Sequence, residues 1–237
     1  MNTGRREFVG AAVAAGLTGT VGGIWTASAR AEEQKPAAKG KTAEEVSPGE
    51  DLMREHGLLK RILLIYGEAI HRLKTKKDLP PKAITDSAGL IRAFVEDYHE
   101  KLEEEHLFPR FRKAGKLVDL VEVLEAQHKA GRKLTDVTLR LATPQALKSD
   151  DDRRALIVSL QRFIRMYNPH EAREDTILFP AFHEIVTQNE YDALGEDFEK
   201  KENQLFGDGG FEKNVARVEA IEKSLGIYDL ARFTPNV

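Results

Sequence analysis

Apolar residues return every three or four positions along four long segments of the chain, the spacing that places them on one face of an α-helix. The four stripes begin at Leu52, Ile84, Leu117 and Leu156, and each continues for several turns. No segment alternates between apolar and polar residues with a period of two, so no β-strand is predicted. The pattern therefore predicts an all-α protein.

Turn and capping residues separate the four predicted helices. Residues 47–50 form a capping box with proline at the first helical position, which starts the first helix. Breaks follow at residues 76–81 and 113–115, Thr143-Pro144 ends the third helix, and Ser149 caps the fourth. Because loops this short join antiparallel neighbours, residues 47–188 are predicted to form an antiparallel up-down four-helix bundle.

Residues 189–237 are predicted to form a C-terminal helical extension. After a glycine-rich turn at 207–210, Phe211, Val218, Ile221 and Leu225 fall on one face of a single amphipathic helix. That helix could cap the bundle or mediate oligomerisation, and the sequence leaves both possibilities open.

The N-terminal segment has the features of an export signal. Arg5-Arg6 precedes a weakly apolar run rich in Gly and Ala, which resembles a twin-arginine signal, and small residues at 27–31 offer cleavage sites. We therefore expect a signal peptide at residues 1–31, a polar linker at 32–46 and a periplasmic protein. The alternative is an uncleaved membrane anchor, since residues 8–25 are uncharged and barely long enough to span a bilayer.

The composition limits the partners and the kinds of site that the chain can have. A net charge of -3 gives no general reason to bind nucleic acid, and contact with a membrane is expected only through the export signal. The chain has no cysteine, which excludes disulfides, thiolate zinc sites and cysteine-held iron–sulfur clusters. Any metal must be held by histidine, carboxylate or backbone oxygen.

Two stretches of the chain are nearly alike. HEKLEEEHLFPRF covers residues 99–111, HEAREDTILFPAF covers residues 170–182, and the two share His, Glu, Glu, Leu, Phe, Pro and Phe in register at an offset of 71. His56 and His128 are separated by a similar offset of 72, so the bundle is predicted to be two copies of one helical hairpin. The LFP segments are interpreted as core residues at which proline kinks or restarts the helix.

The repeat predicts that four histidines meet at one level of the bundle. The sequence midpoints between His56 and His99, between His99 and His128, and between His128 and His170 all fall in predicted turns. Residues equally distant from a turn lie at equal height on antiparallel helices, because each residue adds about 1.5 Å to either helix. One histidine from each helix is therefore expected in a single layer.

Glu103 and Glu174 complete the predicted site, because each lies one helical turn after a histidine, on the same face. Two such His/Glu pairs could bridge two metal ions, and iron, manganese and zinc suit this mixture of imidazole and carboxylate. Glu100 and Glu171 are also duplicated but lie about 100° around the helix, so they are interpreted as solvated or as supporting residues, with a role as an extra metal ligand as the minor alternative.

These residues resemble the hemerythrin-like, HHE cation-binding family over residues 47–188. The resemblance implies two iron ions with an oxo or hydroxo bridge, held by His56, His99, His128 and His170 and bridged by Glu103 and Glu174; manganese and zinc are the alternative metals. It also implies O2, NO or peroxide as the small ligand. Oxygen-carrying members have a second histidine one turn after the third-helix ligand, where this chain has Arg132, which we expect to stabilise bound anions.

Both copies place the carboxylate four residues after the histidine, as in bacterial iron-centre-repair proteins and in the iron-sensing hemerythrin domain of an F-box protein. The leading hypothesis is a di-iron protein that binds or responds to O2 or a related diatomic. The alternatives are a di-iron redox enzyme acting on peroxide, nitric oxide or ferrous iron, and a protein for iron sensing or storage. The sequence does not decide whether the chain is an enzyme.

Overall fold

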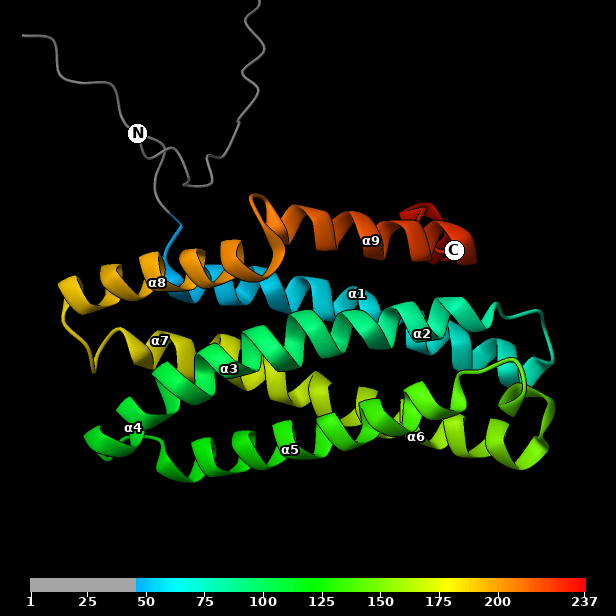
Figure 1. Cartoon of the computed structure of the whole chain (residues 1–237), viewed down its shortest axis with the longest axis horizontal. Helices are drawn as coiled ribbons and strands as arrows, with labels where there is room; N and C mark the ends of the chain where they lie inside the picture. The colour runs from blue at the N-terminus through cyan, green and yellow to red at the C-terminus, as the bar shows by residue number, and fades with distance from the viewer. Residues whose placement is uncertain (1–45) are drawn as a thin grey trace, which may run out of the picture. The chain divides into compact units, whose positions relative to one another are not determined.

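The computed structural model describes residues 46–237, which form helices and contain no strand (Figure 1). The predicted export signal at 1–31 and nearly all of the linker at 32–46 lie outside the described residues. Within the described part of the chain, none of the helices has the length and apolar character needed to cross a membrane.

Four long helical stretches form the bundle, which confirms the predicted all-α, up-down fold (Figure 1). The first is α1 (Pro48–Thr75) and the third is α5 (Val118–Leu141). The second is continuous from Pro81 to Ala114, and the fourth is continuous from Asp150 to Phe182. Their parts are α2 (Pro81–Leu90), η1 (Ile91–His99), α3 (Glu100–Leu102), η2 (Glu103–Leu107) and α4 (Phe108–Ala114), and α6 (Asp150–Arg173), η4 (Glu174–Leu178) and α7 (Phe179–Phe182).

The predicted helix starts are present. The Ser47 side chain accepts the backbone N–H of Glu50, and the Glu50 carboxylate accepts the backbone N–H of Ser47, which satisfies two donors that a helix end leaves free. Ser149 accepts the backbone N–H of Asp152 in the same way at the start of α6. A 3-10 turn, η3 (Ala146–Lys148), lies in the connection before it.

A widened π turn occurs at the same place in both copies of the repeat. The N–H of Phe108 donates to the carbonyl of Glu103 in η2, and the N–H of Phe179 donates to the carbonyl of Glu174 in η4. The proline that follows each phenylalanine has no N–H and its ring crowds the preceding turn, so the regular α pattern is interrupted there. The helix restarts with that proline in its first turn, as the LFP segments predict.

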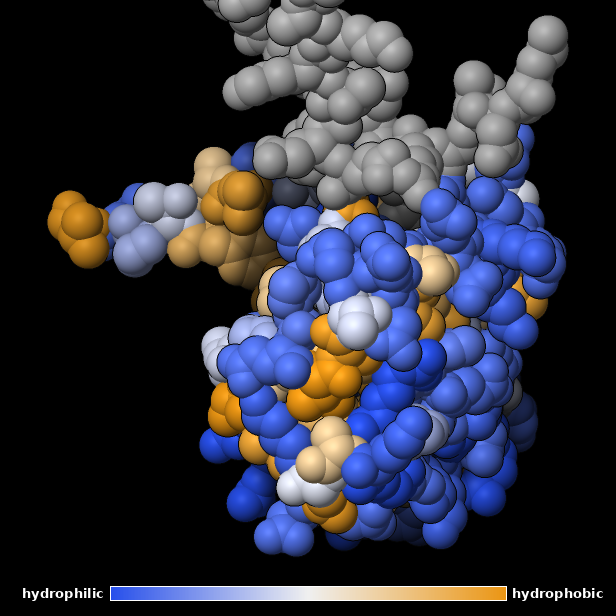
Figure 2. Space-filling view, turned by 90° about the vertical axis from the view of Figure 1, so that its left-hand side faces the viewer, coloured by the Kyte–Doolittle hydropathy of each residue, from blue (hydrophilic) through white to orange (hydrophobic). Residues whose placement is uncertain are grey.

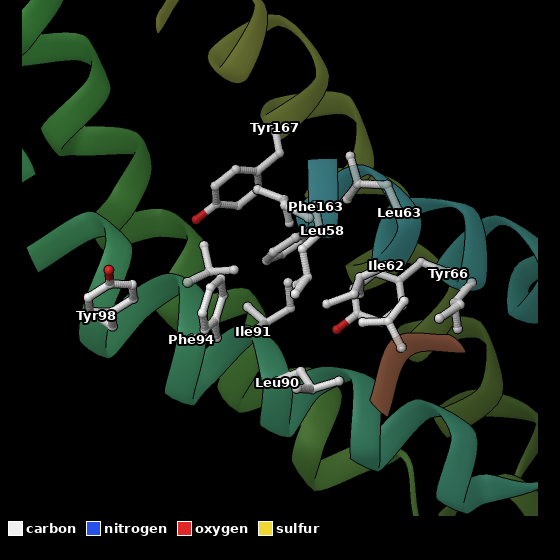
Figure 3. Close-up of a cluster of buried hydrophobic side chains, with 14 of the residues drawn as sticks. Leu58, Ile62, Leu63, Tyr66, Leu90, Ile91, Phe94, Tyr98, Phe163 and Tyr167 are labelled. Atoms are coloured by element: carbon white, nitrogen blue, oxygen red, sulfur yellow. The ribbon is translucent and has the colours of Figure 1, made fainter. Parts of the chain in front are cut away.

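The hydrophobic core lies between the four stretches. Figure 3 shows Leu58, Ile62 and Tyr66 of α1 facing Ile91 and Phe94 of η1, with side chains of α6 completing the cluster. All of these side chains are buried. The polar layer described below interrupts this core, so its groups are held by a rigid, packed scaffold.

The C-terminal extension contains two helices where the sequence analysis predicted one. These are α9 (Gly210–Leu225), at the predicted place, and α8 (Gln188–Phe206), which was not predicted; a 3-10 turn, η5 (Leu230–Phe233), follows. The narrow apolar stripe of α8, Tyr191, Leu194 and Phe198, lies in an otherwise polar sequence and gives a weak periodic signal.

Both helices of the extension cover the bundle on its α1/α2 side. Helix α9 packs on α1 and α2, and α8 packs on α1. Phe206 contacts Phe94 and Tyr98, and Phe198 contacts His106. Figure 2 looks at the end of the bundle near α4 and α7, where hydrophilic residues surround a small hydrophobic patch.

Candidate metal centre

The structure brings all six predicted site residues together inside the bundle. His56 comes from α1, His99 from η1, His128 from α5 and His170 from α6, while Glu103 and Glu174 begin the π turns η2 and η4. Each of the six is at most 3% exposed. Their role as metal ligands stays a prediction. The distances between their side chains show whether they are placed to share a cation.

The four imidazoles form two pairs. His56 Nε2 lies 3.0 Å from His99 Nε2, and His128 Nε2 lies 3.2 Å from His170 Nε2. Two nitrogens bound at right angles to one cation, each at about 2.1 Å, would be about 3 Å apart. Each pair therefore has the spacing of two ligands on a single ion.

Each carboxylate reaches one histidine of both pairs. Glu103 Oε2 lies 3.8 Å from His99 Nε2 and 3.4 Å from His128 Nε2. Glu174 Oε2 lies 3.4 Å from His56 Nε2 and 3.1 Å from His170 Nε2. This is the arrangement in which two carboxylates can bridge two cations.

The donor set fits cations. Both oxygens of Glu103 and both oxygens of Glu174 are buried, and no group donates a hydrogen bond to them. Burying carboxylates without compensation is costly, and coordination is one way to compensate it. His128, His170 and Glu174 have ligand atoms close enough together to hold one ion.

An outer set of oxygen acceptors orients the four rings. The Nδ1 atoms of the histidines lie 2.7 Å from Asp175 at His56, 2.7 Å from Glu55 at His99, 3.2 Å from Glu104 at His128 and 2.9 Å from Gln127 at His170. A ring that donates its Nδ1–H to such an acceptor carries its free lone pair on Nε2. In every ring Nε2 is the atom that faces the centre, so a neutral ring of this tautomer would present its lone pair to a cation there.

These four acceptors were not predicted from the sequence, although the repeat contains them. Glu55 and Gln127 directly precede the histidines of α1 and α5, and Glu104 and Asp175 directly follow the two central carboxylates. Each acceptor serves a histidine on a neighbouring helix. A comparison of the two copies position by position would have revealed them.

The duplicated phenylalanines also belong to the centre. Phe108 stacks on His128 and Phe179 stacks on His56, with ring centroids 5.4 Å apart in both cases. The LFP segments are thus more than core residues, because each places an apolar ring against one imidazole and excludes water from it.

The charged neighbours agree with the sequence-based predictions only in part. Of the two roles predicted for Glu100 and Glu171, the solvated one is wrong because both are buried, whereas the supporting role agrees with their ion pairs to Arg132 at 2.8 Å and Lys60 at 3.0 Å. The Arg132 guanidinium also lies 2.8 Å from Glu104, so it neutralises carboxylates already in the protein and is not available for a bound anion as predicted.

The pKa values of three of these groups are shifted by their burial and by their charged neighbours. Burial acts to lower the pKa of His56, but the adjacent carboxylates of Asp175 and Glu174 outweigh it and raise that pKa to about 10. Burial also acts to raise the pKa of Glu174, but His170 and His56 hold it well below its usual range. Burial and the neighbouring Glu174 raise the pKa of Glu103.

The remaining histidines lie outside the centre. His71 and His183 are exposed. His106 packs against Phe198 of α8.

Comparison with known proteins agrees with this geometry. A family model described as "Hemerythrin HHE cation binding domain" matches residues 47–182 and, a second time, residues 119–224. The second match begins 72 residues after the first, the same offset that separates His56 from His128. No solved structure matches the chain.

Curated relatives have no described activity. Uncharacterized proteins of Mycobacterium bovis and of two strains of Mycobacterium tuberculosis are each 49% identical to this chain over 191 residues. These residues make up 81% of this chain and 75% of each relative.

Proposed function

Because the chain belongs to the hemerythrin HHE cation-binding family, we propose that it holds two iron ions and binds or responds to dioxygen or a related diatomic molecule. One observation carries this proposal: two histidine pairs, each with the spacing of ligands on one ion, share two carboxylates that reach both pairs. Iron suits this mixed imidazole and carboxylate set, with manganese or zinc as the alternative occupants.

The chain's own residues have distinct tasks in this proposal. His56 and His99 hold one cation, His128 and His170 hold the other, and Glu103 and Glu174 link the two. The outer acceptors fix the tautomer and orientation of each ring before a cation arrives. A bound iron pair would supply reversible one-electron chemistry toward O2, NO or peroxide.

A redox enzyme is the second candidate, because the site carries four histidines and Arg132 where oxygen carriers have a fifth histidine. Turnover of peroxide, nitric oxide or ferrous iron by the iron-loaded protein would favour it. Binding without turnover would favour the diatomic-binding role.

Metal analysis combined with spectroscopy tests the proposal. The purified protein, loaded anaerobically with Fe(II), is expected to contain two irons per chain and to develop a near-ultraviolet band when air is admitted. His99→Ala should lose iron and the band, while His71→Ala, which removes an exposed histidine, should retain both. Equal iron content in His99→Ala and in the unmodified protein would refute the proposed site.

A further inference from the structure

The two sides of the centre are related by the repeat, yet their outer rims differ. Each rim has a basic side chain four residues after a histidine, Lys60 on α1 and Arg132 on α5, paired with a buried glutamate. We call the side between α1 and the fourth helical stretch the Lys60 rim, and the side between α5 and the second stretch the Arg132 rim.

The Arg132 rim is closed by several contacts at once. Arg132 Nη2 lies 2.8 Å from Glu100 and 2.8 Å from Glu104, and it also donates to the carbonyl of Glu96. The Tyr167 hydroxyl donates to the other oxygen of Glu100 at 2.6 Å. The side chains of Arg132 and Glu104 are only 21% and 14% exposed. An ion passing here would have to break a multidentate guanidinium clamp.

The Lys60 rim is closed by one flexible side chain. Lys60 Nζ lies 3.0 Å from Glu171 and donates to Asn168 at 2.9 Å, but its side chain is 46% exposed. An ammonium on a four-carbon stem can swing into solvent without disturbing a helix. Its departure would uncover the carboxylate of Glu171, which is fully buried.

Carboxylates lead inward from the Lys60 rim. The side chain of Asp175 is 34% exposed and contacts His56, Glu171 lies one turn before it, and Glu174 is at the centre. Such a series of oxygen ligands attracts a divalent cation and gives it successive partners as it loses water.

We propose that cations enter the centre through the Lys60 rim, where Asp175 and Glu171 receive them and Lys60 moves aside. This inference rests on the proposed function, since it assumes that the centre binds cations. It assigns Lys60 a part in the rate of loading and none in the final coordination.

The rate of Co(II) loading tests the route. Metal-free protein is mixed with Co(II), and the growth of cobalt absorption is followed by stopped flow. Lys60→Met should load about tenfold faster, because it removes the repelling charge and frees Glu171. Lys60→Arg should load more slowly, because it copies the clamp of the other rim. Both variants should reach the cobalt content of the unmodified protein.

Two further variants separate the route from general effects of charge. Lys129→Met removes a lysine from an exposed pair with Glu125 on α5 and corrects for the loss of one positive charge. Arg132→Lys keeps the positive charge but loosens the contacts of the opposite rim, and it should leave the loading rate within about twofold because ions do not enter there.

The outcomes are distinguishable. Faster loading by Arg132→Lys together with unchanged rates at position 60, or equal rates in all variants, would overturn the entry route while leaving the centre intact. Failure of the unmodified protein to take up cobalt or iron would instead overturn the proposed function.

Discussion

Replacing Glu103 by glutamine is expected to stabilise the metal-free protein and to abolish its stabilisation by metal. Both Glu103 oxygens are buried and receive no hydrogen bond, and Glu174 is close enough to raise the pKa of Glu103 further. An unsatisfied buried polar group costs about 1–3 kcal/mol, and more when charged. Glutamine keeps the shape and removes only the cost of being ionisable, because the carboxyl of Glu103 must take up a proton or bury its charge when the chain folds at pH 7. The free energy of unfolding should therefore rise by about 1–3 kcal/mol.

Metal should reverse the order of stability. At a free metal concentration of about 100 Kd, one bound ion adds about 2.7 kcal/mol to the unmodified protein, and Glu103→Gln should gain much less because it lacks a bridging carboxylate. Urea unfolding followed by circular dichroism, with and without Fe(II) under anaerobic conditions, measures both effects.

Glu105→Gln is the matched control, since Glu105 is exposed two residues away on the same helical stretch. It should change neither the metal-free stability nor the gain from metal by more than about 0.5 kcal/mol. The reasoning is refuted if Glu103→Gln is less stable than the unmodified protein without metal, or if metal stabilises both equally.

Three other predictions concern the outer acceptors, the buried carboxyl of Glu96 and the predicted export signal. Glu55→Ala and Gln127→Ala should each lower metal affinity about 10- to 100-fold in a competition titration, whereas Glu55→Gln, which keeps an oxygen acceptor, should retain most of it. Burial raises the pKa of Glu96 to about 7, so this carboxyl destabilises the folded state as pH rises from about 4.5 through 7. The loss in free energy of unfolding between pH 5 and pH 8 should be smaller in Glu96→Gln than in the unmodified protein by up to about 3 kcal/mol. Lysine at both Arg5 and Arg6 should keep the protein in the cytoplasm with residues 1–31 attached, as judged by cell fractionation and N-terminal sequencing.

The bundle could be predicted from sequence because its determinants are local. Helical stripes, caps and short loops are each determined by a few neighbouring residues. Together they specify where the helices lie and that they run antiparallel. The meeting of His56, His99, His128 and His170 followed from equal distances to the turns. Helix α8 was not predicted, because its stabilisation comes from packing on α1 and its own sequence has only a narrow apolar stripe.

The parts of the site that could not be predicted depend on contacts between helices. A charged residue such as Glu100 has the same local pattern whether it is solvated or buried against a partner from another helix. Its burial becomes visible only when Arg132 and Tyr167 are placed around it. The same holds for Glu55, whose partner His99 lies on another helix.

The repeat also explains which features the two halves of the centre share and where they diverge. The histidines, central carboxylates, outer acceptors and stacked phenylalanines all have counterparts at offsets of 71 or 72, as expected if each proposed cation position needs the same support. Tyr167 breaks this symmetry, and it fits only because residue 131 is glycine: a Cβ there would lie 2.1 Å from the Tyr167 hydroxyl. The corresponding position on α1, 72 residues earlier, is Leu59. One half of the centre thus has a phenol hydrogen-bonded to its neighbouring carboxylate, so the two proposed cation positions are unequal in their surroundings even though their nearest side chains match.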